Sequence, residues 1–369
     1  MTAKTRIAVG LSGGIDSSVA AHLLLKQGFD VVGITMQIWD GSLPLKDIGM
    51  SACYGPGEGR DIAAAKEHAE RLGIPYHVIP LSSEFRKEVL DYFKQEYLAG
   101  RTPNPCVRCN ASLKFGLMIE RARKSGIQFD RFATGHYART MYDVATSRFL
   151  LLKGVDPGKD QSYFLSRLSQ DQLQMVMFPL GEKTKDEVRK LADEYGWKHL
   201  VEKPESQNFI EAKDYSVLFK ETPVSTGPIL DMQGNKLGEH RGIIHYTIGQ
   251  RKGVGITGQE KPMFVVRIDT CRNAVIVGPK EELMRKELKA VNLNWIAFDE
   301  TPKEPLKIKA RIRQQHKEAP AEIIPNASGG TPTVMVKFDE PQMAITPGQI
   351  VVFYDSDTVL GSGVIELPT

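Results

Sequence analysis

The stretch Ala8-Val9-Gly10-Leu11-Ser12-Gly13-Gly14-Ile15-Asp16-Ser17-Ser18 decides how this chain folds. Residues 6–9 lead into it as a short, mostly apolar run, which predicts a buried strand. From Ser18 onward, apolar residues recur at helical spacing, so a helix begins at the serine–glycine turn. Such a helix points its free N–H groups and positive dipole end at whatever lies above the strand. The glycine pair lets an anion approach the backbone closely and the serines add donors, so the stretch predicts a phosphate site.

The spacing of this stretch differs from the Walker pattern, which needs four residues between its glycines and then Gly-Lys-Ser/Thr. It reads Ser-Gly-Gly-x-Asp-Ser and resembles the pyrophosphate loop of ATP pyrophosphatases, which adenylate a substrate oxygen and release pyrophosphate. The alternative is a bare serine–glycine turn. We favour nucleotide binding, because all six positions stand together at the first strand–helix junction.

Length and composition describe a protein of more than one domain. The chain has 369 residues, which predicts two or three domains, and its 41% hydrophobic and 25% charged residues are typical of a soluble globular protein. A net charge of +3 does not by itself indicate a nucleic-acid binder. Residues 1–6 lack a secretory apolar region, and no apolar run is long enough to span a bilayer. We therefore expect a cytoplasmic protein without a membrane partner.

Strand and helix patterns alternate through the first half of the chain. Strands are expected at 30–36 and 76–79, helices at 60–72, 85–98 and 114–124, and loops at 41–59 and 100–105. This alternation predicts an α/β fold with a doubly wound parallel sheet. Ligands of such sheets lie at the carboxyl ends of the strands, where the serine–glycine stretch falls.

The second half of the chain changes to β-like runs separated by glycine turns. The alternation weakens near 200–204, so we expect a catalytic domain at 1–204, a small central β-rich domain at 205–283 and a C-terminal β-barrel at 284–369. The runs that predict strands are 227–230, 243–249, 263–268 and 274–277 in the central domain, and 306–312, 333–338 and 350–354 in the barrel.

Four cysteines in a chain this long are too few for a disulfide scaffold. In a reducing compartment, the pair in Cys106-Val107-Arg108-Cys109 indicates redox, metal or sulfur chemistry. Half of a zinc site is the alternative, but no second pair or histidine cluster at zinc spacing accompanies it.

Several motifs together resemble the MnmA family of tRNA-specific 2-thiouridylases, which convert the wobble uridine of certain tRNAs to 2-thiouridine. The resemblance covers almost the whole chain and implies a domain similar to the adenine nucleotide alpha hydrolases. The motifs are Ser12 to Ser17, Thr102-Pro103-Asn104-Pro105-Cys106 to Asn110 with Lys114-Phe115, Ala133-Thr134-Gly135-His136-Tyr137-Ala138, Lys159-Asp160-Gln161-Ser162-Tyr163, Tyr246-Thr247-Ile248-Gly249-Gln250-Arg251 and Thr346-Pro347-Gly348-Gln349.

The resemblance also implies which residues contact ligands. The family tends to have a tyrosine where Ile312 stands, which leaves a stacking contact there open. The residues implied to bind ATP are Gly10, Leu11, Ser12, Gly13, Gly14, Ile15, Asp16, Ser17, Met36 and Gly135. Those implied to contact tRNA are Asn104, Pro105, Cys106, His136, Lys159, Asp160, Gln161, Arg311, Ile312 and Gln349.

By the same resemblance, the nucleophilic cysteine is Cys109. Many family members carry a second catalytic cysteine just before a Phe-Ile pair, but the segment at 205–210 has none. A second thiol is needed to release sulfur from a persulfide by forming a disulfide, and Cys106 and Cys53 are the candidates. Cys53 lies in the loop after the second strand, and loops after adjacent parallel strands converge. Alternatively, Cys53, Cys106 and Cys109 ligate an iron–sulfur cluster with one open iron site.

Replacing a carbonyl oxygen by sulfur requires that the oxygen first become a leaving group. Adenylation by ATP with Mg²⁺ does this, and we expect Ser12, Ser17 and the amides of Gly13 and Gly14 to donate to the phosphates. Asp16 is expected to hold metal or to orient the loop, and Lys159 to neutralise phosphate charge. The sulfur-carrying cysteine must ionise near pH 7, and Arg108 and Lys114 would lower the pKa of Cys109 if they point inward.

We therefore expect an ATP-dependent tRNA 2-thiouridylase that uses a sulfur-donor protein, either a cysteine desulfurase or a sulfur-relay carrier. One alternative is a C–N ligase of the GMP or NAD synthetase kind, which uses the same loop. Another is a tRNA-binding protein without thiolation activity, but the intact stretch at 12–17 and Cys109 argue against lost catalysis.

Overall fold

A computed structural model describes residues 4–49, 52–201, 208–258, 260–326 and 331–368. The chain forms two compact units. The first consists of Met1–Val89, Cys106–Asp214 and Asp357–Val359, and the second of Leu90–Pro105, Tyr215–Ser356 and Leu360–Thr369. The boundary expected at 204/205 lies outside the described residues. The three-domain division stays a prediction.

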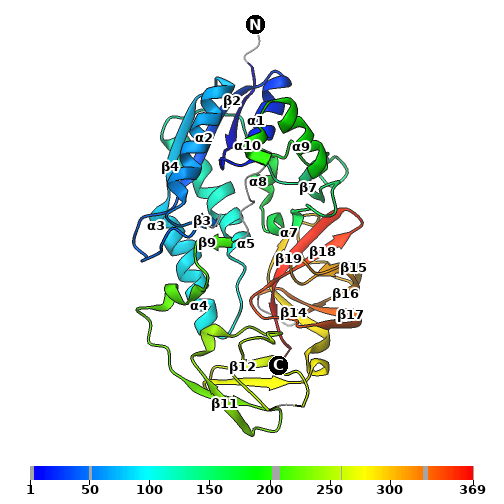
Figure 1. The fold of residues 1–369 in the computed structure, drawn as a ribbon. Coiled ribbons are helices and arrows are strands. Elements are labelled where there is room, and N and C mark those ends of the chain that lie inside the picture. The colour runs from blue at the N-terminus through cyan, green and yellow to red at the C-terminus, as the bar shows by residue number, and fades with distance from the viewer. Residues whose placement is uncertain (1–3, 50–51, 202–207, 259, 327–330, 369) are drawn as a thin grey trace. The chain divides into compact units, whose positions relative to one another are not determined.

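A parallel sheet forms the centre of the first unit, in the order β4-β2-β1-β5-β8. Its strands are β1 (Arg6–Gly10), β2 (Asp30–Gln37), β4 (Tyr76–Pro80), β5 (Arg131–Ala133) and β8 (Val176–Met177). Figure 1 labels strands β4 and β2 of this sheet. The chain runs outward from β1 in one direction through β2 and β4, and in the other through β5 and β8. This reversal beside β1 is where ligands of doubly wound sheets bind, and it confirms the predicted fold class.

The helices that cover this sheet follow the apolar periodicity of the sequence. Helix α1 (Ile15–Lys26) begins three residues before the expected Ser18, and α2 is Glu58–Leu72. Apolar side chains of the sheet and of both helices form one buried core, which includes Ile7, Val9, Leu24 and Ala69. Each is fully shielded from solvent. Burial on this scale stabilises the sheet that carries the serine–glycine stretch.

The segment that contains the cysteine pair is helical but irregular. It comprises α3 (Ser82–Phe85), the π-helix η1 (Arg86–Asp91), α4 (Tyr92–Leu98), α5 (Pro105–Cys109), the π-helix η2 (Asn110–Leu117) and α6 (Met118–Lys124). The helix expected from residue 114 therefore begins earlier, at Pro105. Proline is favourable at a first helical position, where its missing N–H has no partner to lose.

Several elements of the first unit were not predicted. Strand β3 (Ala52–Tyr54) lies in the expected loop and pairs in parallel with β9 (Asn208–Ile210) (Figure 1). Strands β6 (Ala138–Asp143) and β7 (Arg148–Lys153) form a hairpin, and residues 358–359 pair with β7. Four short helices follow: α7 (Ser162–Leu165), α8 (Gln170–Met175), α9 (Lys185–Glu194) and α10 (Lys198–Val201).

The second unit contains a four-stranded sheet in the order β11-β10-β13-β12. Its strands are β10 (Gly227–Leu230), β11 (Lys236–His240), β12 (Phe264–Asp269) and β13 (Ala274–Gly278). The strand expected at 243–249 is wrong. That stretch begins with the 3₁₀ turn η4 (Ile243–His245) and reaches Gly249 at a φ of +88°, outside the range of a regular strand. Two further 3₁₀ turns are η3 (Tyr215–Phe219) and η5 (Lys280–Leu283).

The predicted C-terminal barrel is confirmed. Six antiparallel strands follow in the order β14-β17-β16-β15-β18-β19, and pairing of β14 with β19 closes the barrel. Alternate residues point into a core that includes Val334, Val336 and Phe338. The strands are β14 (Met284–Trp295), β15 (Leu306–Arg311), β16 (Ala319–Asn326), β17 (Thr333–Met343), β18 (Ile350–Asp355) and β19 (Thr358–Glu366).

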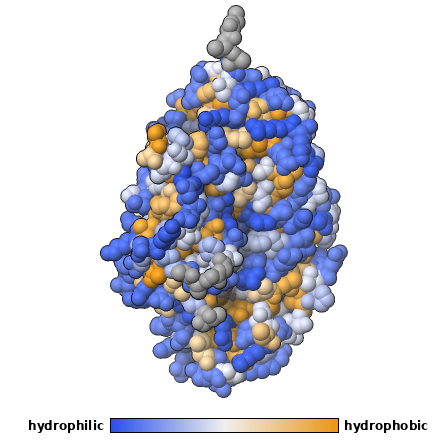
Figure 2. Space-filling view, turned by 180° about the vertical axis from the view of Figure 1, so that it is seen from behind, coloured by the Kyte–Doolittle hydropathy of each residue, from blue (hydrophilic) through white to orange (hydrophobic). Residues whose placement is uncertain are grey.

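One face of the molecule is mainly hydrophilic, with hydrophobic side chains in small separate patches (Figure 2). The most exposed large hydrophobic residue is Val144, at the tip of the β6–β7 hairpin. Within the described part of the chain, no helix combines the length and apolar character needed to cross a lipid bilayer.

Candidate active site

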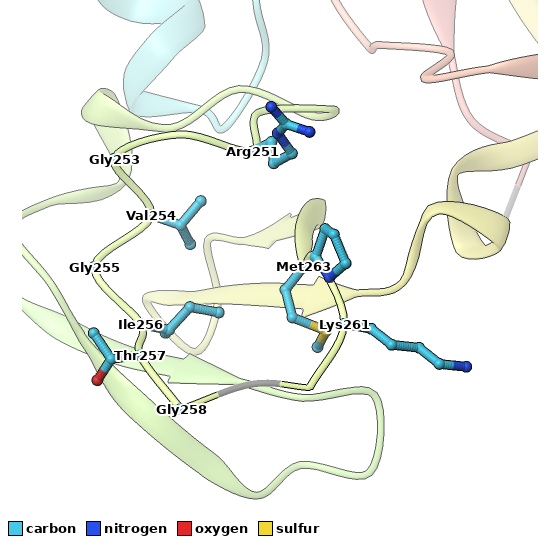
Figure 3. Close-up of a pocket in the computed structure, with 10 residues that line it drawn as sticks. Arg251, Gly253, Val254, Gly255, Ile256, Thr257, Gly258, Lys261 and Met263 are labelled. Carbon is cyan, nitrogen blue, oxygen red and sulfur yellow. The ribbon is translucent and has the colours of Figure 1, made fainter.

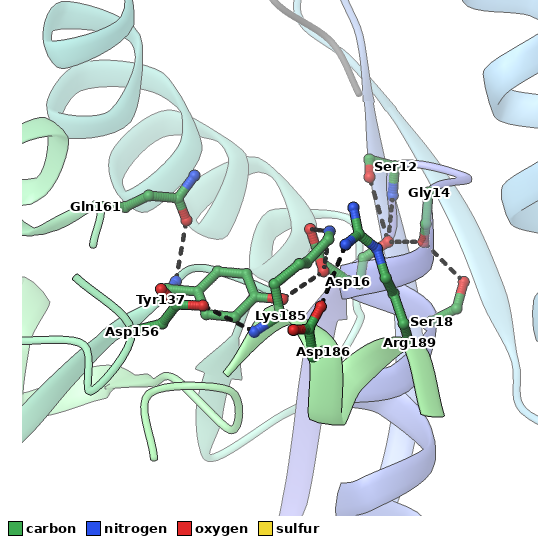
Figure 4. A network of polar contacts seen from close by, with 11 residues as sticks. Ser12, Gly14, Asp16, Ser18, Tyr137, Asp156, Gln161, Lys185, Asp186 and Arg189 are labelled. Carbon is green, nitrogen blue, oxygen red and sulfur yellow. Dashed lines mark hydrogen bonds and ion pairs between the residues drawn. The ribbon is translucent and has the colours of Figure 1, made fainter. Parts of the chain in front are cut away.

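The turn between β1 and α1 presents the donors expected of a phosphate-binding loop. The Ser12 amide donates to Ser17 Oγ at 3.1 Å, and Ser17 Oγ donates to the Gly14 carbonyl at 3.1 Å (Figure 4). Among the described residues, no side chain caps the first turn of α1, whose N-cap is Gly14. The helix N-terminus therefore keeps its N–H groups for an anion.

Position 13 requires a glycine, both for its backbone conformation and because a neighbouring carbonyl group lies close to it. Its φ of +68° lies in the left-handed region, and a Cβ there would lie 2.5 Å from the carbonyl oxygen of Asp61 on α2. No side chain fits at that distance. The loop is thus built tightly against α2.

The carboxylate of Asp16 is held by Lys185, which no motif of the sequence singled out, and by Tyr137, to which no role was assigned from the sequence. Lys185 Nζ lies 2.8 and 2.9 Å from the two carboxylate oxygens, and the Tyr137 hydroxyl donates to Oδ1 at 2.8 Å (Figure 4). Lys185 is buried on α9, with 5% of its surface exposed. These contacts favour the orienting role of Asp16 over the metal-binding one.

A magnesium site made by the protein alone is not present in the described residues, which contain no group of three or more His, Cys, Asp or Glu that could hold a metal ion. Mg²⁺ is commonly held by one or two carboxylates together with substrate phosphates. Asp16 is the acidic side chain of the loop, and its oxygens already accept from Lys185 and Tyr137.

The other residues implied to bind ATP also lie at the carboxyl ends of the parallel strands. Gly10 ends β1, Met36 stands near the end of β2, and Gly135 follows β5. A Cβ on Gly135 would lie 2.7 Å from the Ser17 amide nitrogen, so Gly135 packs directly on the start of α1. One edge of the sheet therefore brings the ten expected ATP residues together.

The candidate thiols of the first unit come from two elements. Cys106 and Cys109 lie on α5, and Cys53 lies on β3. Cys53 and Cys106 are exposed, Cys109 is half-buried, and all are free thiols, as is the exposed Cys271 of the second unit. The described residues thus contain no disulfide between these cysteines.

Surrounding protein makes these thiols hard to ionise. Desolvation by the surrounding protein raises the pKa of Cys109 to about 11 and that of Cys106 to about 12. It also raises the pKa of Cys53, although Cys53 and Cys106 both keep part of their surface exposed to solvent. Negative charge on Cys53 would raise the pKa of both Cys106 and Cys109, and charge on Cys109 would raise that of Cys106. The raised pKa of Cys109 opposes the ionisation near pH 7 that is expected from the sequence.

Lys114 is the cation that counteracts this effect, because its charge lowers the pKa of Cys53, Cys106 and Cys109. It lies in η2, five residues after Cys109, and a π-helix brings residues five apart onto successive turns. Arg108, the other expected neighbour, instead pairs with Glu88 at 2.5 Å on the surface. Of the two basic residues proposed from the sequence, Lys114 is the relevant one.

His136 connects the phosphate loop to the thiols. It directly follows Gly135, which packs on α1, and its ring centre lies 5.7 Å from that of Phe115, next to Lys114. Burial and the charge of Lys114 hold the pKa of His136 well below its usual value, so the ring is neutral. Its Nδ1 lies 2.7 Å from Thr134 Oγ1. Packing thus connects the loop to Phe115, and the charge of the neighbouring Lys114 acts on both His136 and Cys109.

Three further residues expected to contact tRNA follow the β6–β7 hairpin. Asp160 is buried, and its carboxylate accepts from the Ser162 amide and hydroxyl, both at 3.0 Å. Gln161 Oε1 accepts from the Tyr137 amide at 2.9 Å. These two side chains therefore organise the turn, whereas Lys159 beside them is half-buried.

The remaining expected tRNA residues lie in the second unit. Gln349 Nε2 donates to the carbonyls of Thr102 and Pro103, at 3.0 and 3.1 Å, and so supports the loop that carries Asn104 and Pro105. Arg311 is half-buried at the end of β15, and its guanidinium donates to the Gln314 carbonyl.

Ile312 requires a correction. Its side chain is 2% exposed and packs in the barrel core, because an isoleucine is more stable there than in water. The side chain therefore cannot make the direct tRNA contact that the resemblance implies.

The same absence of a ligand group bears on the iron–sulfur alternative. Cys53, Cys106 and Cys109 do not form a metal-holding set within the described residues. An iron–sulfur cluster held by these three cysteines stays a prediction.

A separate pocket of about 410 Å³ lies in the second unit (Figure 3). A glycine-rich loop lines it, and Gly253, Gly255 and Gly258 all have positive φ. Arg251 and Lys261 are its charged residues. Its described lining includes none of the residues expected at the active site.

Models of known protein families match nearly the whole chain, in three consecutive segments. The tRNA methyl transferase HUP domain model matches residues 5–211, the tRNA methyl transferase PRC-barrel domain model matches 215–279, and the aminomethyltransferase beta-barrel domain model matches 285–365. Relatives similar over nearly their full length include the tRNA-specific 2-thiouridylase MnmA 2 of Thermoanaerobacter sp. (strain X514). It is 47% identical over an alignment of 372 positions, which covers 99% of this chain and 99% of the relative.

Two further relatives carry the same description. That of Acetivibrio thermocellus is 46% identical over 371 residues, or 98% of this chain and 99% of the relative. That of Endomicrobium trichonymphae is 46% identical over 367 residues, or 99% of this chain and 100% of the relative.

Proposed function

The chain belongs to the MnmA family of tRNA-specific 2-thiouridylases, and from this membership we propose how its own residues perform the reaction. It is an ATP-dependent sulfurtransferase that acts on tRNA. Relatives that match over nearly the full length set aside the C–N ligase and the non-catalytic tRNA binder. The observation that carries the mechanism is the set of contacts from the phosphate loop through Gly135 and His136 to Lys114 and the thiols.

The first step activates the wobble uridine. Its O2 attacks the α-phosphorus of ATP, an O–P bond forms, and pyrophosphate leaves. The Ser12 and Ser17 hydroxyls, the Gly13 and Gly14 amides and the uncapped start of α1 donate to the departing phosphates. Mg²⁺ bound with ATP would neutralise further phosphate charge. Asp16 orients the loop through Lys185 and Tyr137.

The second step exchanges oxygen for sulfur. The terminal sulfur of a persulfide on Cys109 attacks C2 of the adenylated uridine, and AMP leaves with the former O2. A second thiolate then attacks Sγ of Cys109, which breaks the bond to the transferred sulfur. The products are 2-thiouridine and a disulfide, so the two thiols supply the two electrons that reduce the sulfane sulfur. An external thiol reductant restores both cysteines.

Cys53 is the second thiol in this proposal. Strand β3 pairs with β9 so that Ala52 lies opposite Asn208 and Tyr54 opposite Ile210. Cys53 is therefore one residue along from the partner of Asn208, which directly precedes the Phe209-Ile210 pair, and paired strands lie about 4.8 Å apart. By resemblance, that is where many family members have their second catalytic cysteine. Charge on Cys53 also affects the pKa of Cys109, which supports the same assignment.

A sulfur-donor protein loads the persulfide, and a cysteine desulfurase or a sulfur-relay carrier fits this role. The exposure of Cys53 and Cys106 supports such delivery, because transfer between proteins requires that thiols reach each other. Cys106 is the alternative second thiol.

Mass spectrometry of tRNA treated with the protein, ATP, Mg²⁺ and a persulfide donor tests the proposal. Cys109→Ala should abolish 2-thiouridine, and Cys53→Ala should stop the reaction before sulfur release, with AMP still formed. Cys271→Ala is the matched control, because Cys271 is an exposed thiol of the other unit. Full activity of Cys109→Ala would overturn the mechanism. Full activity of Cys53→Ala would indicate that Cys106, and not Cys53, is the second thiol that attacks Sγ of Cys109.

A further inference from the structure

We infer that Glu211 is a positioning residue for sulfur transfer, which holds the segment around Cys53 so that its thiol can reach Cys109. The inference rests on the proposed role of Cys53 and adds the residue that makes that role possible. Glu211 follows β9 directly and is 2% exposed, so its carboxylate is a buried charge that needs partners.

The carboxylate connects two points of the chain that lie on either side of Cys53. Oε2 accepts the Gly57 amide at 2.8 Å, and Oε1 accepts the Ile48 amide at 3.2 Å. The backbone amide of Glu211 donates to the Tyr54 carbonyl at 2.8 Å. One residue thus fixes the chain before Cys53, next to it and after it.

Packing leaves this contact little freedom. A Cβ on Gly55 would lie 2.4 Å from Glu211 Cβ, so the backbone two residues after Cys53 lies directly against the glutamate. Arg60 pairs with Asp47, the residue before Ile48, and adds a second connection between the two ends of the segment. The segment is therefore held at defined points, whereas its sequence alone predicts only a loop.

The opposite face of β3 explains why Cys53 points to solvent. Tyr54 is 1% exposed, and its ring stacks on Phe85 with centres 5.1 Å apart and planes at 13°. Side chains alternate along a strand, so anchoring Tyr54 on the buried side turns Cys53 to the exposed side. Because β3 pairs with β9, the contacts of Glu211 then fix the position of the exposed Cys53 thiol relative to β9.

This geometry separates two steps of the reaction. Adenylation uses the phosphate loop, whereas the hydrogen bonds described for Glu211 go to Ile48, Tyr54 and Gly57, which lie outside that loop. Formation of the Cys53–Cys109 disulfide needs the two sulfurs to meet in line. A displacement of about 1 Å can slow such a step by about a hundredfold.

The test is a single turnover of persulfide-loaded protein with tRNA and ATP, in which AMP and the Cys53–Cys109 disulfide are measured by mass spectrometry. Glu211→Ala should slow disulfide formation by about tenfold or more while AMP formation changes by less than about twofold. Glu211→Gln keeps one acceptor oxygen but faces the other amide with an NH₂ group, so its rate should lie between those of Glu211→Ala and the unaltered protein.

Gly55→Ala provides an independent disturbance of the same contact, and Gly59→Ala is its matched control because a Cβ there meets nothing within 4 Å. Only Gly55→Ala should slow the disulfide step, which keeps the inference testable if Glu211→Ala does not fold. Equal slowing of AMP and disulfide formation, or no effect on either, would overturn the role of Glu211. If Cys53→Ala forms 2-thiouridine at the full rate, the proposed role of Cys53 fails instead.

Discussion

Lys185 Nζ lies 2.8 Å from Asp16 Oδ1, although the two residues are 169 positions apart in the chain. The contact connects α9 to the first turn of α1, where the phosphate loop ends. The lysine is 6% exposed in its side chain and the aspartate 29%, so water screens the pair only in part. The shape of the phosphate loop therefore depends on a helix that the loop's own sequence does not reveal.

Replacement of Lys185 by Met should weaken both stability and ATP binding. The change removes the Lys185 contact and leaves the Tyr137 hydroxyl as a donor to the Asp16 carboxylate. Loss of a hydrogen bond to a charged group lowers the free energy of unfolding by about 1–3 kcal/mol. Urea unfolding and ATP titration measure the two effects. Lys190→Met, at an exposed position of the same helix, should change neither, and an unaltered ATP affinity in Lys185→Met would contradict the orienting role.

Replacement of Gly13 by Ala should stop pyrophosphate release. The new Cβ would meet the Asp61 carbonyl at 2.5 Å in a backbone conformation that already disfavours alanine, so we expect a loss of about 1–3 kcal/mol in stability. Gly28→Ala separates the two causes, because Gly28 also has positive φ, at +88°, but no neighbour within 4 Å. A pyrophosphate assay should find Gly28→Ala active. Activity in both variants would argue against the tight loop.

Replacement of Lys114 by Met should make Cys109 less reactive. Lys114 lowers the pKa of Cys109, which burial raises to about 11, so removing the positive charge raises that pKa further and reduces the thiolate fraction. The rate of Cys109 alkylation, followed by mass spectrometry, should fall several-fold at each pH below 10. Arg108→Met should leave the rate unchanged, since Arg108 pairs with Glu88. The opposite ranking would make Arg108 the activating residue.

The free energy of unfolding should fall as the solution becomes acidic. Burial holds the pKa of His136 below the value of about 6.5 that it has in the unfolded chain, so below that pH the unfolded chain takes up a proton that the folded protein does not. The stabilisation is complete above about pH 6.5 and is lost as the pH falls. His136→Gln should reduce the slope by about 1 kcal/mol per pH unit, whereas exposed His77→Gln should not. Urea unfolding between pH 5 and pH 8 measures this.

Local sequence signals predicted the parts of the site that depend on neighbouring residues. The parallel sheet and the turn between β1 and α1 follow from apolar periodicity and glycine placement. The helix that carries Cys109 was not predicted, since a helix was expected only from residue 114. The partners of Asp16 and the position of Glu211 could not be predicted in this way. Lys185 reads as an ordinary helix residue, and its burial becomes evident only when α9 packs on α1.

Strand β3 is another element that its own sequence does not predict. Three residues in a glycine-bearing loop carry no clear alternation, and the strand exists because β9, more than 150 positions later, supplies its hydrogen bonds. The resemblance to a family indicated where a second catalytic cysteine is missing, and the sequence suggested Cys53 as a candidate to replace it. Pairing of the two strands is what the sequence could not supply.

Residues 90–105 pack with the C-terminal part of the chain. Phe93 lies against Tyr215, with ring centres 5.2 Å apart, and the Thr102 amide donates to the Pro347 carbonyl at 2.8 Å. A recombinant fragment that stops after residue 211 would carry the phosphate loop and all three candidate thiols, yet it would leave this inserted stretch without its partners. During synthesis on the ribosome, likewise, the stretch must wait for nearly the last residues to emerge before it can settle into place.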